Sequence, residues 1–212
     1  MPVPTKEELQ AALEARHGKE RQDKWSAATV AICGLGGLGS NIALSLARAG
    51  VGHLILIDFD RVDITNLHRQ QYMLAQLGQY KTEALADTLR TISPYIRLTT
   101  ITERVTEENY REFLAPADVI CEAFDSAEAK AMLVNCVLET MPGRYLVSAS
   151  GMAGLGQANT IQTRRLTRHF YLCGDGVSDV NDGMCLVSSR VTLCAAHQAH
   201  AVLRILAEEY DV

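Results

Sequence analysis

The chain has 212 residues, of which 48% are hydrophobic and 21% are charged, and its formal net charge is −5. This balance is typical of one globular α/β domain with a sizeable core and argues against a disordered chain. The acidic charge argues against a nucleic-acid partner, because domains that bind nucleic acids usually carry a basic surface. No apolar run is long enough for a transmembrane helix, and the first residues lack the pattern of a signal peptide. We therefore expect a cytoplasmic protein without a membrane partner.

Strands and helices are predicted to alternate along the chain. Residues 5–25 have the pattern of one charged amphipathic helix, which suits packing or dimerisation better than a separate domain. Strands are expected at 29–33, 53–58, 97–101, 118–123 and 145–150, with a candidate sixth at 157–163. The later helices are expected at 40–49, 81–92, 106–113, 127–140 and 191–209. Residues 171–183, rich in Gly, Asn and Asp, predict a mobile loop. The alternation predicts a Rossmann-like, doubly wound, mostly parallel sheet in a single domain over 28–212, preceded by a helical extension over 1–27.

A glycine-rich turn follows the first expected strand. Gly34, Gly36 and Gly39 fit the pattern G-x-G-x-x-G, and Gly37 adds a fourth glycine. Glycines allow a tight turn that brings backbone N–H groups close to a phosphate, and the following helix presents the positive end of its dipole. Asp58 lies about 20 residues further on, at a strand end where an acid usually accepts hydrogen bonds from ribose hydroxyls. Up to this point, the pattern is that of an NAD-dependent oxidoreductase.

The polar residues that follow Asp58 favour a triphosphate over a dinucleotide. They are Asp60, Asn66, Arg69, Gln70 and Lys81. Arginine grips phosphate oxygens in a fork and lysine adds a point charge, and a departing pyrophosphate needs such cations, usually with Mg²⁺. Asp125, just after the fourth strand, is predicted to lie on the same sheet edge and is the candidate Mg²⁺ ligand.

Four segments of the chain resemble the signatures of the ThiF/MoeB/HesA family, the bacterial relatives of ubiquitin-activating enzymes. They are GLGGLGS at 34–40, IDFDRVDITNLHRQ at 57–70, GQYK at 78–81 and EAFDSAEAK at 122–130. The chain is most similar to the short ThiF-like branch linked with thiamine biosynthesis. The resemblance implies an enzyme that binds ATP and Mg²⁺ and adenylates the C-terminal Gly-Gly carboxylate of a small ubiquitin-like sulfur carrier, releasing pyrophosphate.

The same resemblance implies roles for individual residues. Gly36 would lie in the turn over the nucleotide, and Asp58 would take the ribose hydroxyls. Asn66, Arg69 and Lys81 would contact the phosphates.

Three further roles follow from the resemblance. Gln70 would lie beside the phosphate-binding residues, and Asp125 would associate with the metal. An arginine from the N-terminal helix of a second subunit would complete the site in a homodimer. Arg16 and Arg21 are the candidates for it, and Arg16 is preferred.

The chain departs from its relatives in its cysteines. Many relatives hold a structural zinc with two Cys-x-x-Cys pairs, a pattern that is missing here. The scattered Cys173, Cys185, Cys194, His197 and His200 fit reduced thiols and packed or exposed histidines better than a zinc site. Some relatives use a loop cysteine in sulfur transfer. Cys173 and Cys185 flank the corresponding loop, so the sequence leaves a thiol step open.

Three other functions compete with adenylation of a carrier. The same fold could adenylate a small or tRNA-borne carboxylate, although the acidic charge counts against a tRNA. An NAD-dependent oxidoreductase would explain the glycine turn and Asp58 but would leave Asn66, Arg69, Lys81 and Asp125 without a role. A non-catalytic nucleotide-binding scaffold is the third alternative. The glycine-rich residues 151–156 fit either a groove for the carrier tail or a simple tight turn.

Overall fold

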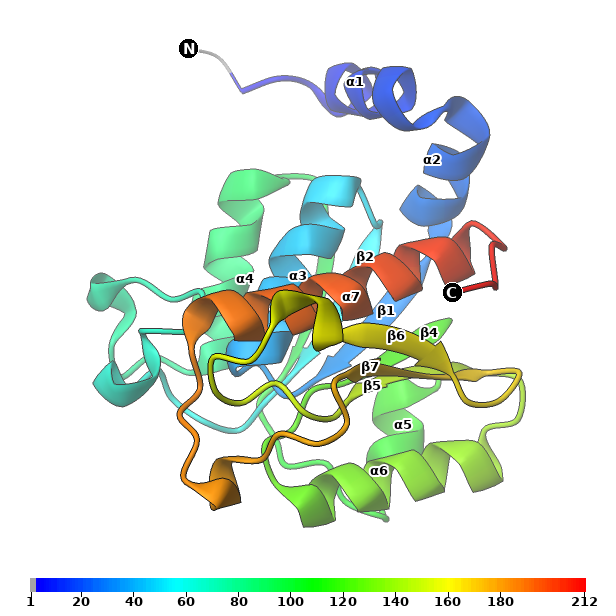
Figure 1. Cartoon of the computed structure of the whole chain (residues 1–212). Helices are drawn as coiled ribbons and strands as arrows, with labels where there is room; N and C mark the ends of the chain where they lie inside the picture. Colours follow the sequence, from blue (N-terminus) through cyan, green and yellow to red (C-terminus); the bar gives the residue numbers. More distant parts are fainter. Residues whose placement is uncertain (1–2) are drawn as a thin grey trace.

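A seven-stranded sheet with the order β3-β2-β1-β4-β5-β7-β6 forms the centre of the computed structural model, which describes residues 3–212 (Figure 1). The strands are β1 Thr29–Cys33, β2 His53–Ile57, β3 Arg97–Ile101, β4 Val119–Glu122, β5 Tyr145–Ala149, β6 Gln162–Arg165 and β7 Phe170–Gly174. Neighbouring strands are parallel except for β6, which runs antiparallel to β7. The strand order reverses between β1 and β4, because successive strands are added on one side of β1 up to β3 and on its other side from β4 onward. Open sheets of this kind bind ligands at the carboxyl ends of the strands at such a switch point. The predicted doubly wound, mostly parallel sheet is confirmed.

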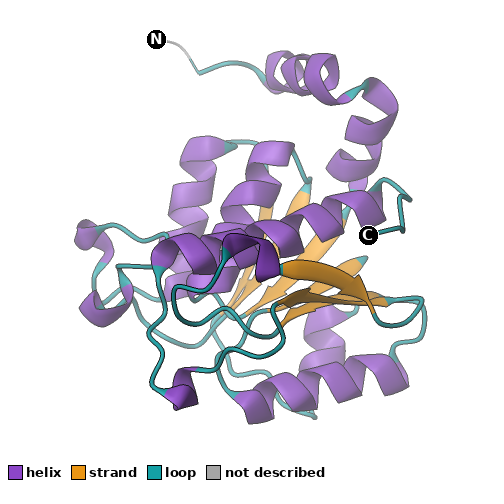
Figure 2. Ribbon diagram, viewed as in Figure 1, coloured by secondary structure: helices purple, strands orange, loops and turns teal. Residues whose placement is uncertain are grey.

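Helices cover both faces of this sheet (Figure 2). They are α1 Lys6–His17, α2 Lys19–Ala27, α3 Gly37–Ala49, α4 Lys81–Ile92, α5 Tyr110–Leu114, α6 Ala127–Thr140 and α7 Ser188–Leu206. Short 3-10 turns are η1 Ile64–Asn66, η2 Leu74–Gln76, η3 Ala158–Thr160 and η4 Val180–Asp182. Helices α3, α4 and α7 pack on one face of the sheet, and α5 and α6 pack on the other. Among residues 3–212, no helix combines the length and apolarity needed to cross a bilayer.

The central strands are apolar throughout because they are buried on both faces. In β1, Val30 and Ile32 join the core with α3 and α7, whereas Ala31 and Cys33 join the core with α5 and α6. A strand covered by helices on both sides reads as a continuous hydrophobic run in the sequence. The sheet edge at the ends of these strands is therefore held rigidly from both faces.

The N-terminal extension consists of two helices where the sequence pattern predicted one. Gly18 separates α1 from α2 with φ 84° and ψ 141°, a conformation that residues with a side chain rarely adopt. None of the described residues of α1 is buried, and Figure 1 shows this helix projecting from the body. In contrast, α2 buries Gln22 and Trp25, and the Trp25 indole N–H donates to the Leu203 carbonyl of α7 over 2.9 Å.

The prediction of a mobile loop over 171–183 is wrong for its first residues. Residues 171–174 belong to β7, which pairs with β5 and β6 and buries Tyr171 and Cys173. Gly174 is required at the strand end, because a Cβ there would lie 1.9 Å from the Ser150 carbonyl oxygen. The sixth strand lies at Gln162–Arg165, after the 3-10 turn η3. Helices α3 and α7 begin three residues earlier than predicted, and α5 begins at Tyr110 instead of residue 106.

Candidate nucleotide site at the carboxyl edge of the sheet

Three of the four glycines in the turn after β1 are required by close packing. A Cβ on Gly34 would lie 2.7 Å from the Ala123 carbonyl oxygen, and one on Gly39 would lie 1.8 Å from the Gly34 carbonyl oxygen. A Cβ on Gly37 would lie 2.9 Å from a Val191 methyl group. A Cβ on Gly36 would have only the Gln70 amide nitrogen, 3.7 Å away, within 4 Å among the described residues. Gly36 is therefore the glycine of this turn that leaves room for a ligand.

The N-terminus of α3 faces the same turn. The helix begins at Gly37, and its N-cap residue Gly36 provides no side-chain hydrogen bond to the first N–H groups. The first turn of a helix has unpaired N–H donors and a positive dipole end, so this geometry accepts an anion. The Ser40 hydroxyl donates to the Gly36 carbonyl over 2.6 Å, and the Asn41 amide donates to the Gly37 carbonyl over 2.7 Å.

Asp58, at the end of β2, holds this turn in position. One carboxylate oxygen accepts the Leu35 N–H over 2.7 Å, and the other accepts the Asp60 N–H over 2.8 Å. Burial raises the pKa of Asp58 above its usual value, although nearby Lys81 and these two N–H groups oppose the change. The Tyr72 hydroxyl fixes the other side of Leu35 by donating to its carbonyl over 2.8 Å. Tyr72 was not predicted as a site residue, although it lies two residues after the family string at 57–70.

Lys81, the first residue of α4, brings a buried cation to the end of β2. Its ammonium nitrogen lies 2.9 Å from an Asp60 oxygen and 3.9 Å from an Asp58 oxygen. The Lys81 side chain is 6% exposed, whereas that of Asp60 is 49% exposed. Of the two acids, Asp60 is therefore the one whose carboxylate is accessible to a ligand.

Arg69 and Asn66 lie on the other side of the glycine turn. The Arg69 guanidinium donates to the Asn66 side-chain oxygen over 3.1 Å. The aliphatic part of Arg69 lies against Gly37, with Cγ 3.4 Å from the position a Cβ would take. Gln70 is buried beside Gly36, and its Oε1 has no hydrogen-bond partner within residues 3–212. A buried acceptor of this kind is normally paired, so it marks a place where a ligand donor would fit.

Asp125 lies on the exposed turn after β4. This turn packs against the glycine turn, since Ala123 and Phe124 are the neighbours of Gly34. Mg²⁺ typically uses one or two protein carboxylates together with substrate phosphates, so the position of Asp125 fits a nucleotide-bound Mg²⁺. Residues 3–212 contain no group of three or more His, Cys, Asp or Glu that could hold a metal ion by themselves.

A buried ionic cluster that was not predicted supports the turn before Asp125. Glu122 is fully buried at the end of β4, and one of its oxygens accepts the Phe124 N–H over 2.7 Å. The other oxygen accepts hydrogen bonds from the Lys130 ammonium and the Ser148 hydroxyl. Glu122 and Lys130 both lie in the string that resembles the family, but their pairing depends on the fold.

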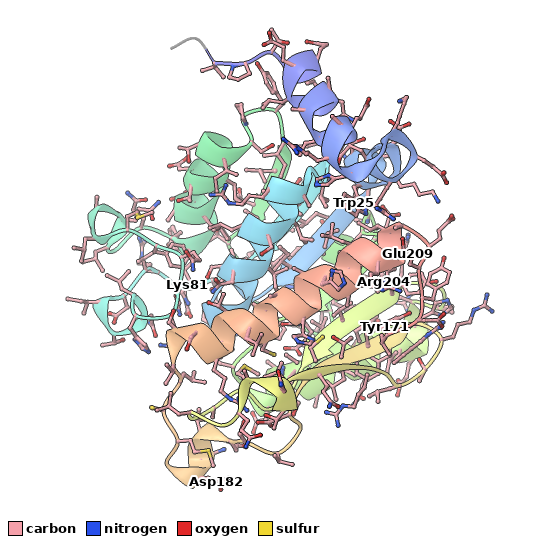
Figure 3. All side chains as sticks on the ribbon, turned by 45° about the horizontal axis from the view of Figure 1, so that its top comes forward. Trp25, Lys81, Tyr171, Asp182, Arg204 and Glu209 are labelled. Carbon is pink, nitrogen blue, oxygen red and sulfur yellow. The ribbon has the colours of Figure 1, made fainter. Side chains whose placement is uncertain are left out.

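The two N-terminal arginines lie at the opposite edge of the sheet. Helix α2 leads into the amino end of β1, whereas the glycine turn follows its carboxyl end. In Figure 3, Lys81 lies near the first residues of α7, and Trp25 lies at its far end. Arg21 forms an ion pair with Glu209 at 3.0 Å, and Arg16 is exposed on α1. The structure thus brings together every predicted site residue except Arg16 and Arg21, which lie beyond reach of the site in the same chain.

The cysteines near the predicted sulfur-transfer loop differ in exposure. Cys173 is buried in β7, and burial raises its pKa to about 11, which disfavours the reactive thiolate. Cys185 is exposed on the following loop. Cys194 is buried in α7, and burial raises its pKa to about 12. Among these residues, Cys185 has the greatest solvent access.

The fold and the turn define a doubly wound α/β domain with an anion-accepting glycine turn at its switch point. The chain belongs to the ThiF family, whose family model matches residues 8–211. This confirms the family predicted from the sequence.

Relatives within this family carry different names. The molybdopterin-synthase adenylyltransferase of Salmonella typhimurium is 30% identical over 194 residues, which are 89% of this chain and 76% of that protein. The tRNA threonylcarbamoyladenosine dehydratase of Escherichia coli is 32% identical over 155 residues, covering 72% of this chain and 57% of that protein. The sulfur carrier protein adenylyltransferase of Thermus thermophilus is 33% identical over 149 residues, covering 68% and 50%. The chain therefore spans about half the length of the last two relatives.

Solved structures show the same fold. The E. coli tRNA N6-threonylcarbamoyladenosine dehydratase in complex with ATP superposes with a TM-score of 0.86 at 22% identity, covering 98% of both chains. Its complex with AMP superposes with a TM-score of 0.85 at 21% identity, covering 99% of this chain and 98% of the other.

Proposed function

We propose that this protein is an ATP-dependent adenylyltransferase that activates the C-terminal glycine carboxylate of a small ubiquitin-like sulfur carrier. The observation that carries the proposal is the gathering of Lys81, Arg69 and Asn66 around the uncapped glycine turn. Relatives named as adenylyltransferases of a sulfur carrier and of molybdopterin synthase support the reaction class. Within this class we assign a carrier of the thiamine type, on the resemblance to the short ThiF-like branch.

In this proposal, different residues of the carboxyl edge bind different parts of the nucleotide. The first N–H groups of α3 and the side chains of Asn66 and Arg69 bind phosphate oxygens, and Lys81 neutralises them. The sequence resemblance gave the ribose hydroxyls to Asp58, but this acid is buried and both of its oxygens already accept backbone N–H groups. We therefore give the ribose hydroxyls to the exposed Asp60, with Asp58 fixing the turn. Asp125 would hold Mg²⁺, which supplies charge neutralisation on the phosphates when it is bound.

The reaction requires positioning and charge neutralisation more than proton transfer. The carrier carboxylate is already an anion at neutral pH, so it attacks the α-phosphorus without a general base. A carboxylate oxygen bonds to this phosphorus as the bond to the bridging oxygen breaks, and pyrophosphate leaves with the electron pair. Arg69 and Lys81 stabilise the charge that develops on the leaving group.

A homodimer completes the site in this proposal. Arg16 is exposed on the projecting α1 and lies at the wrong edge of the sheet for its own site. We therefore assign Arg16 to the site of a second copy. Arg21 is not assigned to it, because Arg21 is paired with Glu209 of its own chain.

The test is ATP–pyrophosphate exchange with Mg²⁺, with and without a ubiquitin-like protein ending in Gly-Gly. We expect exchange that depends on the carrier and falls by about 100- to 1,000-fold in Arg69→Ala, the loss typical of removing a group that stabilises developing charge. Arg90→Ala is the matched control, because Arg90 is exposed on α4, away from the glycine turn, and its ion pair within residues 3–212 is with Asp87. Tight NAD binding without exchange would contradict the proposal.

A tRNA-borne carboxylate is the second candidate substrate. The similarity to the E. coli dehydratase favours it, and the acidic net charge of this chain counts against it. Exchange stimulated by tRNA, and unchanged by carriers ending in Gly-Gly, would replace the first proposal with this one.

A further inference from the structure

Arg190 is a buried cation in an unfavourable position of a helix. It is the third residue of α7, and it is 6% exposed. The positive end of the helix dipole disfavours a cation in the first turn, and burial removes its hydration. Arg190 must therefore be stabilised by specific contacts.

All five N–H groups of the Arg190 guanidinium are directed at acceptors on two loops. Nε donates to the Ala153 carbonyl at 3.2 Å, and Nη1 donates to the carbonyls of Gly156 at 2.9 Å and Gln157 at 3.0 Å. Nη2 donates to the Thr160 hydroxyl at 3.1 Å and to the Asp175 carboxylate at 2.6 Å. Arginine has five donors in a fixed planar fork, which lysine cannot reproduce.

Asp175 connects the second loop to this cluster. Its other oxygen accepts the N–H groups of Val177 and Ser178, each over 2.9 Å, and the Ser178 hydroxyl accepts the Ala153 N–H over 3.0 Å. Gly151 makes room for this arrangement, since a Cβ there would lie 2.0 Å from the Asp175 carboxylate. Backbone hydrogen bonds also join the loop after β5, residues 150–160, to the loop after β7, residues 175–187: the Gly154 N–H donates to the Cys185 carbonyl over 2.8 Å, and the Asp175 N–H donates to the Gly151 carbonyl over 2.9 Å. Arg190 adds a side-chain connection that ties both loops to α7.

The same turn of α7 also contacts the nucleotide turn. Val191 packs against Gly37, and the Thr192 hydroxyl donates to the Asn41 side-chain oxygen over 3.3 Å. Both loops start at carboxyl ends of strands, on the edge that holds the glycine turn. Arg190 thus fixes the two loops relative to the proposed phosphate site.

Hydrophobic burial does not hold the tips of these loops. The side chains of Leu155 and Val177 are 81% and 82% exposed, and Val180 is 50% exposed. Exposed apolar side chains on loops beside a site are available for contact with a partner. Hydrogen bonds therefore position these tips, and the Arg190 fork is the part of that network that connects both loops to α7.

We propose that Arg190, acting with Asp175, is a positioning residue for the carrier protein that is adenylated. It holds residues 150–160 and 175–187 as the wall beside which the carrier's carboxyl-terminal segment lies. This inference rests on the proposed adenylation. It adds a residue that affects binding of the carrier but not binding of ATP.

Arg190→Lys and Asp175→Asn test this role. The first keeps the charge and loses the fork, whereas the second keeps an acceptor for Val177 and Ser178 and loses the charge. We expect both to accelerate backbone hydrogen exchange in the two loops and to raise the KM for a Gly-Gly carrier by about 10- to 100-fold, the range expected for a misplaced substrate. The Kd for ATP should stay within about twofold. Arg204→Lys, at the far end of α7, is the matched control because it contacts Glu209 and the Asp211 carbonyl.

Two results would overturn the inference. Unchanged hydrogen exchange in both loops would show that Arg190 does not hold them. Faster hydrogen exchange in the loops with an unchanged KM for the carrier, or with an equal loss of ATP affinity, would show that Arg190 has only a structural role. If the wild-type protein supports no ATP–pyrophosphate exchange with any carrier, the proposed function fails. Backbone hydrogen exchange would still show whether Arg190 holds the loops.

Discussion

Three buried acids hold the backbone turns at the ends of three strands. Asp58 follows β2, Glu122 ends β4 and Asp175 follows β7, and each accepts at least one N–H group from the turn beside it. Each acid also has a cation partner: Lys81, Lys130 and Arg190, respectively. Charged hydrogen bonds are stronger than neutral ones, so these acids give a loop-rich edge a defined geometry.

The carboxylate of Asp175 should make stability depend on pH in the acid range. Burial would raise its pKa, but hydrogen bonds from Ser178, Val177 and Arg190 outweigh burial and lower the pKa to about 2. An unfolded aspartate titrates near pH 4, so the folded state gains about 2 kcal/mol that is fully present above pH 4 and is lost as the pH falls towards 2. Urea unfolding of the wild type and Asp175→Asn across this range measures the difference.

Asp175→Asn should lack this part of the acid dependence, because an amide does not titrate. The gap between the two stability curves should therefore narrow as the pH falls from 4 to 2. Parallel curves over that interval would show that Asp175 is not held as a carboxylate by these bonds.

At the scale of elements, different glycines of the turn between β1 and α3 serve packing and ligand binding. Gly39→Ala should lower the free energy of unfolding by about 3 kcal/mol, because its Cβ would overlap the Gly34 carbonyl. Gly36→Ala should change this free energy by less than about 0.5 kcal/mol, because its Cβ meets no close neighbour. The same Gly36→Ala change should weaken ATP binding about tenfold, since the methyl group would occupy the space for the phosphates. Urea denaturation and calorimetric titration with ATP measure the two effects, and equal effects of both substitutions on stability would contradict this division.

Most of the sheet could be predicted from the sequence because buried parallel strands leave continuous apolar runs. The strand β7 could not, since the glycine and aspartates that follow Cys173 carry the composition of a loop, and pairing with β5 overrides that local signal. The break between α1 and α2 had a local signal in Gly18, but the apolar pattern continues through it. Helix α3 begins at Gly37, with Gly39 two residues later, although glycine has poor helix propensity. The close packing of these glycines against Val191 and Gly34 determines this start.

The site divides in the same way. The residues of the polar run after Asp58 could be named from the sequence because they lie close together and match two neighbouring family strings, and the structure places them at one edge of the sheet. The contacts of Glu122 and Arg190 join segments that are distant along the chain, so no spacing in the sequence indicates them. Arg16 could be named from the family resemblance alone, and its place at the opposite edge of the sheet required the fold.

At the scale of the whole molecule, the two edges of the sheet are assigned to different contacts. The carboxyl edge carries the proposed nucleotide and acceptor sites, and the amino edge carries α1 and α2. Ion pairs of Arg21 with Glu209 and Lys24 with Glu208 connect α2 to the residues that follow α7. Arg16 therefore has to be supplied by a second copy if it acts in the site.

Mixing two inactive variants tests this assignment. Arg16→Ala and Arg69→Ala should each be inactive alone, but a dimer with one chain of each kind has one site in which both arginines are intact. Random pairing makes half of the dimers mixed, so pyrophosphate exchange should return to about a quarter of the wild-type rate.

Arg21→Ala is the control, because Arg21 is held by Glu209 and should be dispensable for exchange. A mixture without activity would place Arg16 in its own chain or remove it from the site. A monomer by light scattering with full activity would end the homodimer proposal.

Helix α7 also sets the order in which this domain can assemble. It packs across α3 and the ends of four strands, and it supplies much of the core on that face of the sheet. Its residues 188–206 follow every described strand in the sequence, so they leave the ribosome after these strands. Until then, α3 and the sheet carry an open apolar face. The glycine turn lacks its contact with Val191, the two loops lack Arg190, and Trp25 of α2 lacks the Leu203 carbonyl. The proposed active site is thus complete only after this helix has docked, and the apolar face that α7 covers is exposed until then, which favours aggregation of partly folded chains.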